Sequence, residues 1–358
     1  MKRRLGSAIV GAGMIGTIHA RAVRAAGGDV IAVATSDSST AGATADRLAA
    51  DRGTGDWRDL LDDPAVDVLH VCTPNHLHAE IAAAALAAGK HVICEKPLAM
   101  DLGQAEALHR QAATSGLVAA VPFVYRFYGA VRDARARVTH GETGPVRLVH
   151  GTYLQDWLSR PEDTNWRVDP ATSGASRAFG DIGVHWCDLI EFVTGQRIAR
   201  LSARLFTVDR PGGPVLTEDG GTLMFETDAG VIGSAVISQV SPGRKNRLWF
   251  SVEGETASVQ FDQENPDALW IGGRAGNQVI PRGAEASHPD AAPYNPIAVG
   301  HPMGYQDCFT AFVGDVYRTI RGETVDGLPT FADGLRAATI TNAVLDAAKT
   351  NSWVEVPR

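Results

Sequence analysis

The feature that most constrains the fold is an alternation of short apolar runs with alanine-rich helical patterns across residues 1–124. The runs predict strands at residues 7–10, 30–34, 66–71, 91–94 and 118–121. The patterns between them predict helices at residues 17–26, 40–52, 79–88 and 102–114. This repetition is typical of βαβ units, and it predicts an α/β domain built on a doubly wound parallel sheet.

The texture of the chain changes after Phe123. Alternating apolar and polar residues predict further strands at residues 146–153, 198–207, 221–226, 231–240 and 248–253. Helical patterns follow at residues 183–194, 308–321 and 332–349, and residues 272–304 form a Pro/Gly-rich stretch that we interpret as a long surface segment. We therefore expect a Rossmann domain over residues 1–124 and an α+β domain with a large, mainly antiparallel open sheet over residues 125–358. The closing helix at residues 332–349 is expected to pack back on the first domain.

Composition excludes several classes of protein. The 33 basic and 41 acidic residues give a formal charge of -8, which argues against a nucleic-acid partner. No apolar stretch reaches the roughly 18 residues of a membrane span, and the short apolar stretch after the basic N-terminus is too brief for a signal peptide. The four cysteines are far apart in the sequence, which indicates free thiols and a reduced, cytoplasmic setting.

A complete GxGxxG motif follows the first predicted strand, in residues Gly11, Gly13, Met14, Ile15 and Gly16 with Ala12 between the first two glycines. In such a motif the first glycine permits a tight turn and the second lets the backbone approach a pyrophosphate. The third lets the helix pack closely on the strand. The amide groups at the helix N-terminus then bind the anion. The context favours a dinucleotide site, and the alternative is a glycine-rich turn without a ligand.

The end of the second predicted strand bears on the choice of cofactor. A carboxylate roughly 20 residues beyond the glycines would bind the ribose 2′-hydroxyl of NAD. Here the chain has Thr35, Ser36 and Asp37. Thr35 and Ser36 could accept the 2′-phosphate of NADP, but no arginine stands beside them to pair with it. The residues favour NAD and leave NADP open.

Two short motifs carry candidate catalytic groups. Glu95, Lys96 and Pro97 come directly after a predicted strand, at the carboxyl edge where open α/β sheets bind ligands. Further along, Asp181 and His185 are four residues apart, so on a helix they would share a face and the aspartate could orient the histidine as a general base. The alternatives are a surface lysine beside a proline, and an N-cap aspartate above a structural histidine.

The order and spacing of these motifs resemble those of the glucose–fructose oxidoreductase/inositol dehydrogenase (Gfo/Idh/MocA) family. Thr73, Pro74 and Asn75, followed by His78, are similar to that family's loop over the cofactor. Tyr125 and Arg126 are similar to its crossover segment, and residues 330–335 to its closing pattern. The resemblance covers essentially the whole chain. It departs at residues 35–36, where many members have an acidic residue.

The resemblance implies a chemistry. His185 would remove the proton of a ring hydroxyl, Asp181 would orient His185, and Lys96 would stabilise the charge that develops on the same oxygen. Hydride would pass to C4 of the nicotinamide. No metal is expected, because no cluster with metal-ligand spacing is evident in the sequence.

Further residues are candidates for binding a polyhydroxylated ring. Aromatic, amide and guanidinium side chains gather ahead of the Asp181 motif and near the start of a later helix: Tyr153, Gln155, Trp157, Trp166, Arg167, His301 and Tyr305. With Lys96, Tyr125, Arg126, Asp181 and His185 they make up the expected substrate site. Packing in the core or at a helix start is the alternative for each. Arg177 could bind a substrate anion or pair with Asp181 or Glu162.

The sequence leaves three functions open. The first is a sugar, anhydrosugar or inositol dehydrogenase; the second is a glycoside-cleaving enzyme that recycles its bound NAD; the third is a non-catalytic nucleotide-binding protein. A homodimer or homotetramer is expected through the open sheet face, because helices are predicted for one face only and because relatives of the family usually pair there.

Overall fold

The computed structural model describes residues 3–210 and 217–358, which divide into two compact units. One unit comprises Met1–Val124 and Tyr305–Ala338, and the other comprises Tyr125–Gly304 and Thr339–Arg358. One crossing of the chain thus lies after Val124, where we placed the domain boundary. Residues 305–338, which we assigned to the second domain, belong to the first unit instead. The physical reason is that the helix beginning at Tyr305 packs against the helix that follows the glycine motif.

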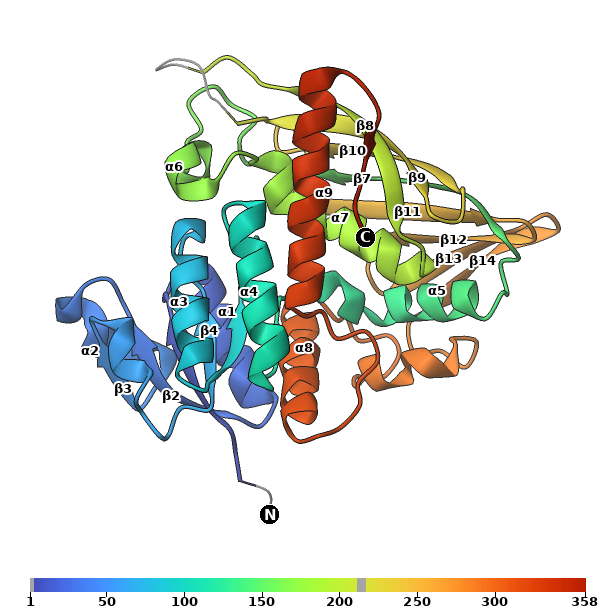
Figure 1. Cartoon of the computed structure of the whole chain (residues 1–358). Coiled ribbons are helices and arrows are strands. Elements are labelled where there is room, and N and C mark those ends of the chain that lie inside the picture. The colour runs from blue at the N-terminus through green and yellow to red at the C-terminus, as the bar shows by residue number, and fades with distance from the viewer. Residues whose placement is uncertain (1–2, 211–216) are drawn as a thin grey trace. The chain divides into compact units, whose positions relative to one another are not determined.

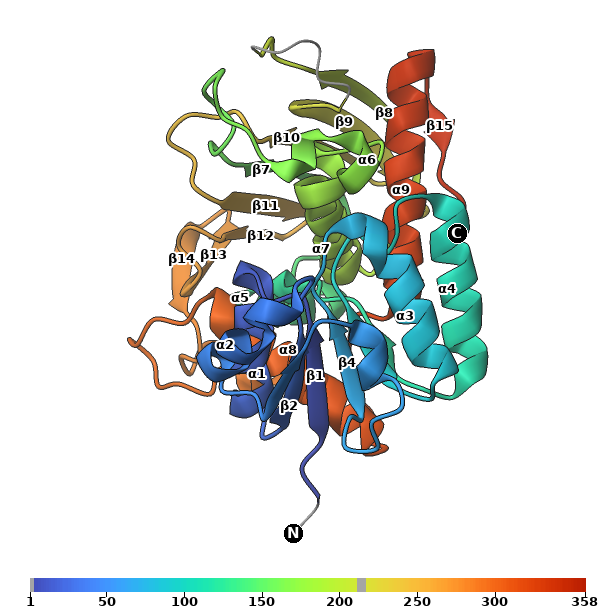
Figure 2. The same ribbon diagram turned by 90° about the vertical axis from the view of Figure 1, so that its left-hand side faces the viewer.

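The first unit is a doubly wound Rossmann fold, as the sequence predicts. Its sheet has the strand order β3-β2-β1-β4-β5-β6, and every neighbouring pair is parallel. The strands are β1 (Gly6–Val10), β2 (Asp29–Ala34), β3 (Arg52–Thr54), β4 (Val68–Val71), β5 (His91–Cys94) and β6 (Ala119–Ala120). The helices are α1 (Met14–Ala25), α2 (Ser38–Leu48), α3 (His78–Ala87), α4 (Leu102–Ser115) and α8 (Tyr305–Ile320). Figure 2 shows β2, β1 and β4 side by side, with α1 and α2 on one face and α3 and α4 on the other.

Local sequence explains where these elements begin and end. β1 and β4 are buried along their whole length, as expected for strands covered on both faces. Asp37 and Asp101 cap the N-termini of α2 and α4 with their side chains. The predicted helix at residues 40–52 was too long, because Ala49 adopts a left-handed conformation after Leu48 and the chain then turns into β3.

The second unit contains a nine-stranded sheet with the order β14-β13-β12-β11-β7-β10-β9-β8-β15. Its strands are β7 (Val146–Leu154), β8 (Ile198–Phe206), β9 (Gly220–Thr227), β10 (Ile232–Ser238), β11 (Arg247–Gly254), β12 (Ala257–Asp262), β13 (Ala268–Gly273), β14 (Gly276–Pro281) and β15 (Val354–Glu355). The expected mainly antiparallel sheet is confirmed, with one parallel pair, β7 with β10, at its centre. We missed β12 and β13, and β14 was wrongly placed in a loop, because these strands are short and separated by tight turns.

Helices cover one face of this sheet. Both α5 (Gly129–Thr139) and α7 (Val184–Thr194) pack on it (Figure 1). No apolar period in the sequence predicts α5, because an arginine occupies a core position. Arg132 is buried, and its guanidinium lies 3.9 Å from the centroid of the Tyr294 ring. On the opposite face, large apolar side chains are exposed: Leu148, Met224, Ile232 and Val236.

The last helix connects the two parts of the chain. α9 (Phe331–Thr350), which the sequence predicts at residues 332–349, begins in the first unit and ends in the second. Just before it, Thr330 forms an antiparallel bridge with Ala120 of the first unit. After it, β15 pairs with β8 of the second unit. Within residues 3–210 and 217–358, no helix combines the length and apolar character needed to cross a membrane.

Candidate functional site

The three glycines of the GxGxxG motif are required for different reasons. Gly11 has φ +96°, and a Cβ atom there would lie 2.5 Å from the carbonyl oxygen of Cys72. A Cβ atom on Gly16 would lie 2.1 Å from the carbonyl oxygen of Gly11. At Gly13, by contrast, φ is -70° and a Cβ atom would have no neighbour within 4 Å. The chain's own packing does not require a glycine at residue 13, so the free space there fits a ligand that approaches the backbone.

This space lies at the N-terminus of α1. Gly13 is the N-cap and offers no side chain to the first amide groups of the helix, and no acidic residue stands in the first turn. Met14 is largely exposed and Ile15 is half-buried. An uncapped helix N-terminus beside an open backbone is a binding site for an anion such as a pyrophosphate. The residues therefore fit the dinucleotide that the motif predicts.

The end of β2 presents a carboxylate. The Asp37 carboxylate accepts hydrogen bonds from the Ser39 hydroxyl and from its backbone N–H (2.8 Å to the latter), and both bonds lower the pKa of Asp37. Thr35 donates its hydroxyl to the backbone carbonyl of Asp37 at 2.7 Å, and Ser36 is exposed. The three residues predicted to select the cofactor thus form one capped turn with a net negative charge.

His78 ties two predicted cofactor loops together within the first unit. Its Nδ1 lies 2.7 Å from the carbonyl oxygen of Pro97, and its Nε2 lies 2.9 Å from that of Thr73. Asn75 begins the single helical turn that lies between Thr73 and His78 in the sequence. Both carbonyls can only accept, and burial lowers the pKa of His78, so the neutral ring donates to one of them at a time. His78 therefore brings the loop after β4 and the cis Lys96–Pro97 loop after β5 together.

The second unit gathers the other predicted catalytic group with two tyrosines. His185 is buried near the start of α7, and its ring meets that of Tyr125 edge-on with the centroids 5.0 Å apart. The Tyr153 ring lies 6.4 Å from His185, and the hydroxyls of Tyr125 and Tyr153 are 2.5 Å apart. Three residues predicted for the substrate site are thus in contact.

Asn246 completes this group, and the sequence reasoning missed it. Its Oδ1 accepts from the Tyr153 hydroxyl at 2.9 Å, and its Nδ2 donates to the Tyr125 hydroxyl at 3.3 Å. With Tyr125 donating to Tyr153, the three side chains form a closed ring of hydrogen bonds. We call it the tyrosine–asparagine ring. Gln155 also donates to Asn246 Oδ1 at 2.7 Å, and its own oxygen accepts from Trp157 at 2.8 Å. The register of β11 against β7 is the signal that could have revealed Asn246.

Asp181 lies in a turn that the sequence did not foresee. Residues Phe179–Gly183 are π-helical, so the four-residue spacing of an α-helix does not describe the approach of Asp181 to His185. Gln239 donates its amide to Asp181 at 2.8 Å, and Arg167 Nε lies 3.6 Å from the other carboxylate oxygen. Gln239 is buried and is a second polar residue that the sequence reasoning missed.

Two arginines named from the sequence are committed to buried ion pairs. Arg126 holds Asp188 with two of its nitrogens, one of them 2.8 Å from the carboxylate. For Arg177 the sequence left open a substrate anion, Asp181 or Glu162 as the partner, and the structure shows another one. Arg177 pairs with Asp219 at 2.5 Å, and both side chains are fully buried. The sequence could not show this pairing because the two residues are far apart along the chain.

The remaining candidates have other contacts within their own units. Trp166 is exposed, and the Arg167 guanidinium lies 4.4 Å above its ring. His301 is exposed, and its backbone carbonyl accepts from Arg282. Tyr305 starts α8 in the first unit, where its ring packs edge-on against Phe309 at 5.0 Å. These contacts do not by themselves place Trp166, His301 or Tyr305 in the substrate site.

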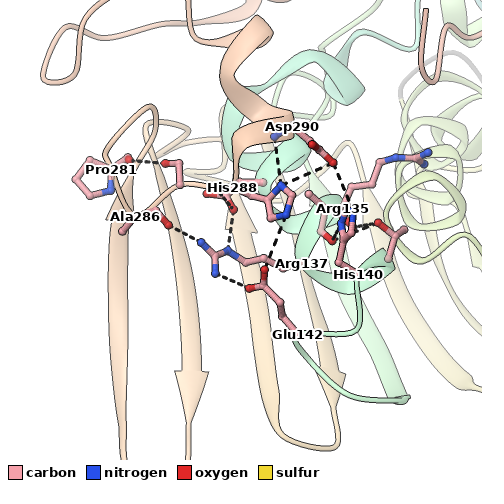
Figure 3. A network of polar contacts seen from close by, with 12 residues as sticks. Arg135, Arg137, His140, Glu142, Pro281, Ala286, His288 and Asp290 are labelled. Atoms are coloured by element: carbon pink, nitrogen blue, oxygen red, sulfur yellow. Dashed lines mark hydrogen bonds and ion pairs between the residues drawn. The ribbon is translucent and has the colours of Figure 1, made fainter.

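A separate polar cluster is shown in Figure 3. In the part of the chain that the structure describes, His140, His288 and Asp290 are the one group whose ligand atoms lie near enough to hold a metal, within 4.8 Å of one another. The two imidazole rings are stacked 4.7 Å apart with 24° between their planes. An imidazole lone pair lies in the ring plane, so two stacked rings cannot both point at one ion. The backbone N–H of Asp290 also donates to Nδ1 of His288 at 3.2 Å. We therefore assign no metal to this cluster.

The class of the protein follows from these features and from family models. Residues 5–123 match the model described as an oxidoreductase family with an NAD-binding Rossmann fold, and residues 131–260 match the Gfo/Idh/MocA C-terminal domain. The chain therefore belongs to the Gfo/Idh/MocA family of oxidoreductases, and its first unit holds the NAD-binding fold of that family.

Similar proteins narrow the comparison. The levoglucosan dehydrogenase of Pseudarthrobacter phenanthrenivorans is 33% identical over 354 residues, which cover 91% of this chain and 89% of that protein. A structure of levoglucosan dehydrogenase with NADH and levoglucosan superposes with a TM-score of 0.93 at 31% identity, covering 99% of this chain and 100% of the other. An inositol dehydrogenase homologue from Azotobacter vinelandii with NADH and myo-inositol gives a TM-score of 0.87 at 28% identity, covering 99% and 98%.

Proposed function

We propose that the protein oxidises a ring hydroxyl of an anhydrosugar, sugar or inositol to a ketone, or catalyses the reverse reaction, with NAD as the cofactor. The observation that carries this proposal is the contact of His185 with the tyrosine–asparagine ring, which groups a titratable base with several hydroxyl and amide groups. The similarity to levoglucosan dehydrogenase favours an anhydrosugar, and dehydrogenation is favoured over glycoside cleavage because the relatives named above are dehydrogenases.

His185 is proposed as the general base that removes the proton of the hydroxyl. Its tyrosine neighbours restrict the orientation of the imidazole, and positioned bases of this kind contribute about 10²- to 10⁴-fold to turnover. Asp181 is proposed to orient the site through its contacts with Gln239 and Arg167. Lys96 would donate to the same substrate oxygen and stabilise the developing negative charge.

NAD is proposed over NADP because of the charge at the end of β2. The Asp37 carboxylate has a lowered pKa, so it is ionised at neutral pH, and an anion at this place disfavours a 2′-phosphate and suits a ribose hydroxyl. Bound NAD would supply the hydride acceptor, C4 of the nicotinamide. The residues proposed to hold it are those of the glycine motif, the β2 end and the loops at Thr73–Asn75 and Glu95–Pro97.

The free space at Gly13 offers a test of cofactor binding that does not need the substrate. We expect Gly13→Ala to weaken NADH binding about tenfold or more, measured by nicotinamide fluorescence, while the melting temperature changes little because the new methyl group meets no protein atom. Gly16→Ala is the matched variant, and it should destabilise the fold because its methyl group meets the Gly11 carbonyl. Equal NADH affinity in Gly13→Ala and the unmodified chain would contradict the proposed cofactor site.

We propose that five side chains bind the hydroxyl groups of the substrate: Tyr125, Tyr153, Gln155, Trp157 and, in addition to those predicted from the sequence, Asn246. Arg126 is proposed to act indirectly, since its guanidinium holds Asp188 on α7 and so positions the helix that carries His185. Trp166, Arg167, His301 and Tyr305 remain proposals from the sequence.

A homodimer or homotetramer through the open sheet face also remains a proposal. It is supported by a patch in which Ile232 and Leu148 are register neighbours on adjacent strands and both are exposed, with Val236 further along β10. Light scattering should give the mass of a dimer or tetramer, and Val236→Lys should reduce it. A monomeric unmodified chain would refute this assembly.

The activity itself is tested by absorbance at 340 nm with purified protein, NAD or NADP, and a panel of levoglucosan, other anhydrosugars, pyranoses and inositols. We expect a rise in absorbance with NAD and at least one of these polyols. The His185→Gln variant, assayed in parallel, should abolish the rise without changing NADH binding. Cleavage of a nitrophenyl glycoside without net NADH would instead favour the recycled-cofactor hydrolase.

A further inference from the structure

We propose that His19, a residue outside every motif used above, is a positioning residue for Lys96, acting through the carboxylate of Glu95. The inference rests on the proposed function, in which Lys96 is catalytic. His19, Glu95 and Lys96 all lie in the first unit. In this proposal, a side chain in the interior of the Rossmann domain positions a catalytic residue.

The observation is a continuous row of buried polar side chains, which we call the buried polar chain. Glu95 Oε1 lies 3.1 Å from His19 Nε2, and His19 Nδ1 lies 2.9 Å from His70 Nδ1. His70 Nε2 lies 3.3 Å from the Ser7 hydroxyl, which lies 2.7 Å from the hydroxyl of Tyr317. His19, His70, Ser7 and Tyr317 are fully buried, and Glu95 is nearly so. The five residues come from the end of β5, α1, β4, β1 and α8.

The direction of the first hydrogen bond follows from the charge of Glu95. Burial by itself would raise the pKa of the Glu95 carboxyl, but the hydrogen bond and charge of His19 and the charge of Lys96 outweigh it and leave that pKa below its ordinary value. The carboxylate is therefore ionised at neutral pH and can only accept. His19 must carry a proton on Nε2 and donate it to Glu95.

The groups around this contact agree with that direction. Burial holds the pKa of His70 well below its ordinary value, so His70 is neutral. One proton then lies between the Nδ1 atoms of His70 and His19 and forms their hydrogen bond. The other titratable groups that face Glu95 are His78, Lys96, Cys72 and Cys94. Burial raises the pKa of both thiols far above neutrality, and burial lowers that of His78, so these three remain uncharged. Lys96 supplies the countercharge from the surface of the unit.

The second carboxylate oxygen of Glu95 connects His19 to the loop that carries Lys96. Glu95 Oε2 accepts the backbone N–H of Lys96 at 3.1 Å. The carbonyl oxygen of Pro97, the residue after Lys96, lies 2.7 Å from His78 Nδ1. The backbone that carries Lys96 is therefore held on both sides, on one side by the ionised carboxylate. Without the proton on His19 Nε2, the carboxylate would lose its partner inside the sheet and the constraint on its rotation.

A matched pair of substitutions tests the proposal. His19→Gln places an amide nitrogen where Nε2 was, whereas His19→Asn places one where Nδ1 was, so only the glutamine can still donate to Glu95. We expect His19→Gln to retain kcat within about threefold and His19→Asn to lose about tenfold or more in kcat. Both bury one amide, so their melting temperatures should be similar. Equal kcat values for the two variants would overturn the proposal.

A measurement on the unmodified chain keeps the test decisive if either variant fails to fold. In protein labelled with [¹⁵N]histidine and free of cofactor, the ¹⁵N spectrum should show the His19 ring with its proton on Nε2. The His19 signal is assigned through a conservative His70→Asn or His19→Gln variant, whichever folds. A His19 ring with a bare Nε2 at neutral pH would overturn the proposal without any assay of activity.

The design separates failure of this inference from failure of the proposed function. If Lys96→Ala is fully active, the proposed role of Lys96 is wrong and His19 has nothing catalytic to position. If Lys96→Ala and His185→Gln are inactive but H19Q and H19N are indistinguishable, the dehydrogenase stands and only the role of His19 is refuted.

Discussion

The two units each contain a hydrogen-bonded row of side chains, and the rows differ in how they meet solvent. The buried polar chain of the first unit runs from Glu95 to Tyr317 through residues of β1, β4, α1 and α8, all inside the sheet and its covering helices. The tyrosine–asparagine ring of the second unit is continued by Gln155 and Trp157, which are half-buried, as is Asn246.

This contrast indicates different tasks. A buried row in which every group has a partner is rigid, because each lost hydrogen bond leaves a polar atom without water. A half-buried row can exchange a protein partner for a hydroxyl group of a ligand at little cost. The first arrangement suits the fixed geometry of a lysine loop, and the second suits the recognition of a polyol that enters and leaves.

The largest expected effect is that of replacing His185, the proposed general base in the second unit. His185→Gln should lower kcat about 10³-fold while NADH affinity stays the same, because the amide cannot accept a proton but still fits beside Tyr125. Steady-state kinetics and fluorescence titration of NADH measure the two quantities. A variant with more than a tenth of the original kcat would show that the base lies elsewhere.

The next largest effect is a loss of folding stability in acid, which we expect from the titration of His70 in the first unit. The pKa of His70 is lowered in the folded chain, so below about pH 6.5 the unfolded chain binds more protons than the folded one. The free energy of unfolding contributed by neutral His70 is therefore fully present above pH 6.5 and is lost as the pH falls below it, by up to roughly 1.4 kcal/mol per pH unit. Urea denaturation at several pH values measures the slope. His70→Asn, which cannot titrate, should make it shallower, and identical slopes would contradict the burial of a neutral imidazole.

A smaller effect is expected from opening the tyrosine–asparagine ring. Asn246→Ala should raise the substrate KM about tenfold and change kcat by less than about threefold, because Tyr125 and Tyr153 lose the partner that orients their hydroxyls. Asn246→Asp retains the acceptor for Tyr153, so its KM should rise less. A drop in kcat with constant KM would instead place Asn246 in the chemical step.

The smallest effect is expected at the far end of the buried polar chain. Tyr317→Phe removes the hydroxyl that meets Ser7, and we expect a loss of about 1 kcal/mol in the free energy of unfolding. Burial raises the pKa of Tyr317 to about 12, so this group is neutral throughout the pH range of the assays and the loss should not depend on pH. A loss that grows in mild acid would show that Tyr317 is coupled to the titration of His70.

The sequence predicted the residues whose roles are local. Gly11, Gly13 and Gly16 stand between a buried strand and a helix, and the meaning of the motif follows from that order. Lys96 and His185 could be proposed as catalytic residues because their neighbours in the sequence form recognisable motifs. The parallel and antiparallel sheets followed from periodicity in the same way.

Residues whose partners are distant in the sequence could not be found. Asn246 has no distinctive neighbours in the sequence, and the register of β11 against β7 brings it to Tyr153. His19 and His70 each stand alone in apolar segments, where a satisfied core histidine is the natural interpretation. Arg132 obscured helix α5 because stacking on aromatic rings allows a charged residue to take a core position.

The division of the chain has a consequence for modularity. Because Tyr305–Ala338 belongs to the same unit as Met1–Val124, the nucleotide-binding fold is assembled from two separated stretches of sequence. A fragment that stops at Val124 would leave the α1 surface that α8 covers without its helix, and it would leave the Ser7 hydroxyl without Tyr317. Residues 1–124 alone therefore do not contain the complete Rossmann domain. Transplanting these residues onto another substrate domain would require a host that supplies α8 as well.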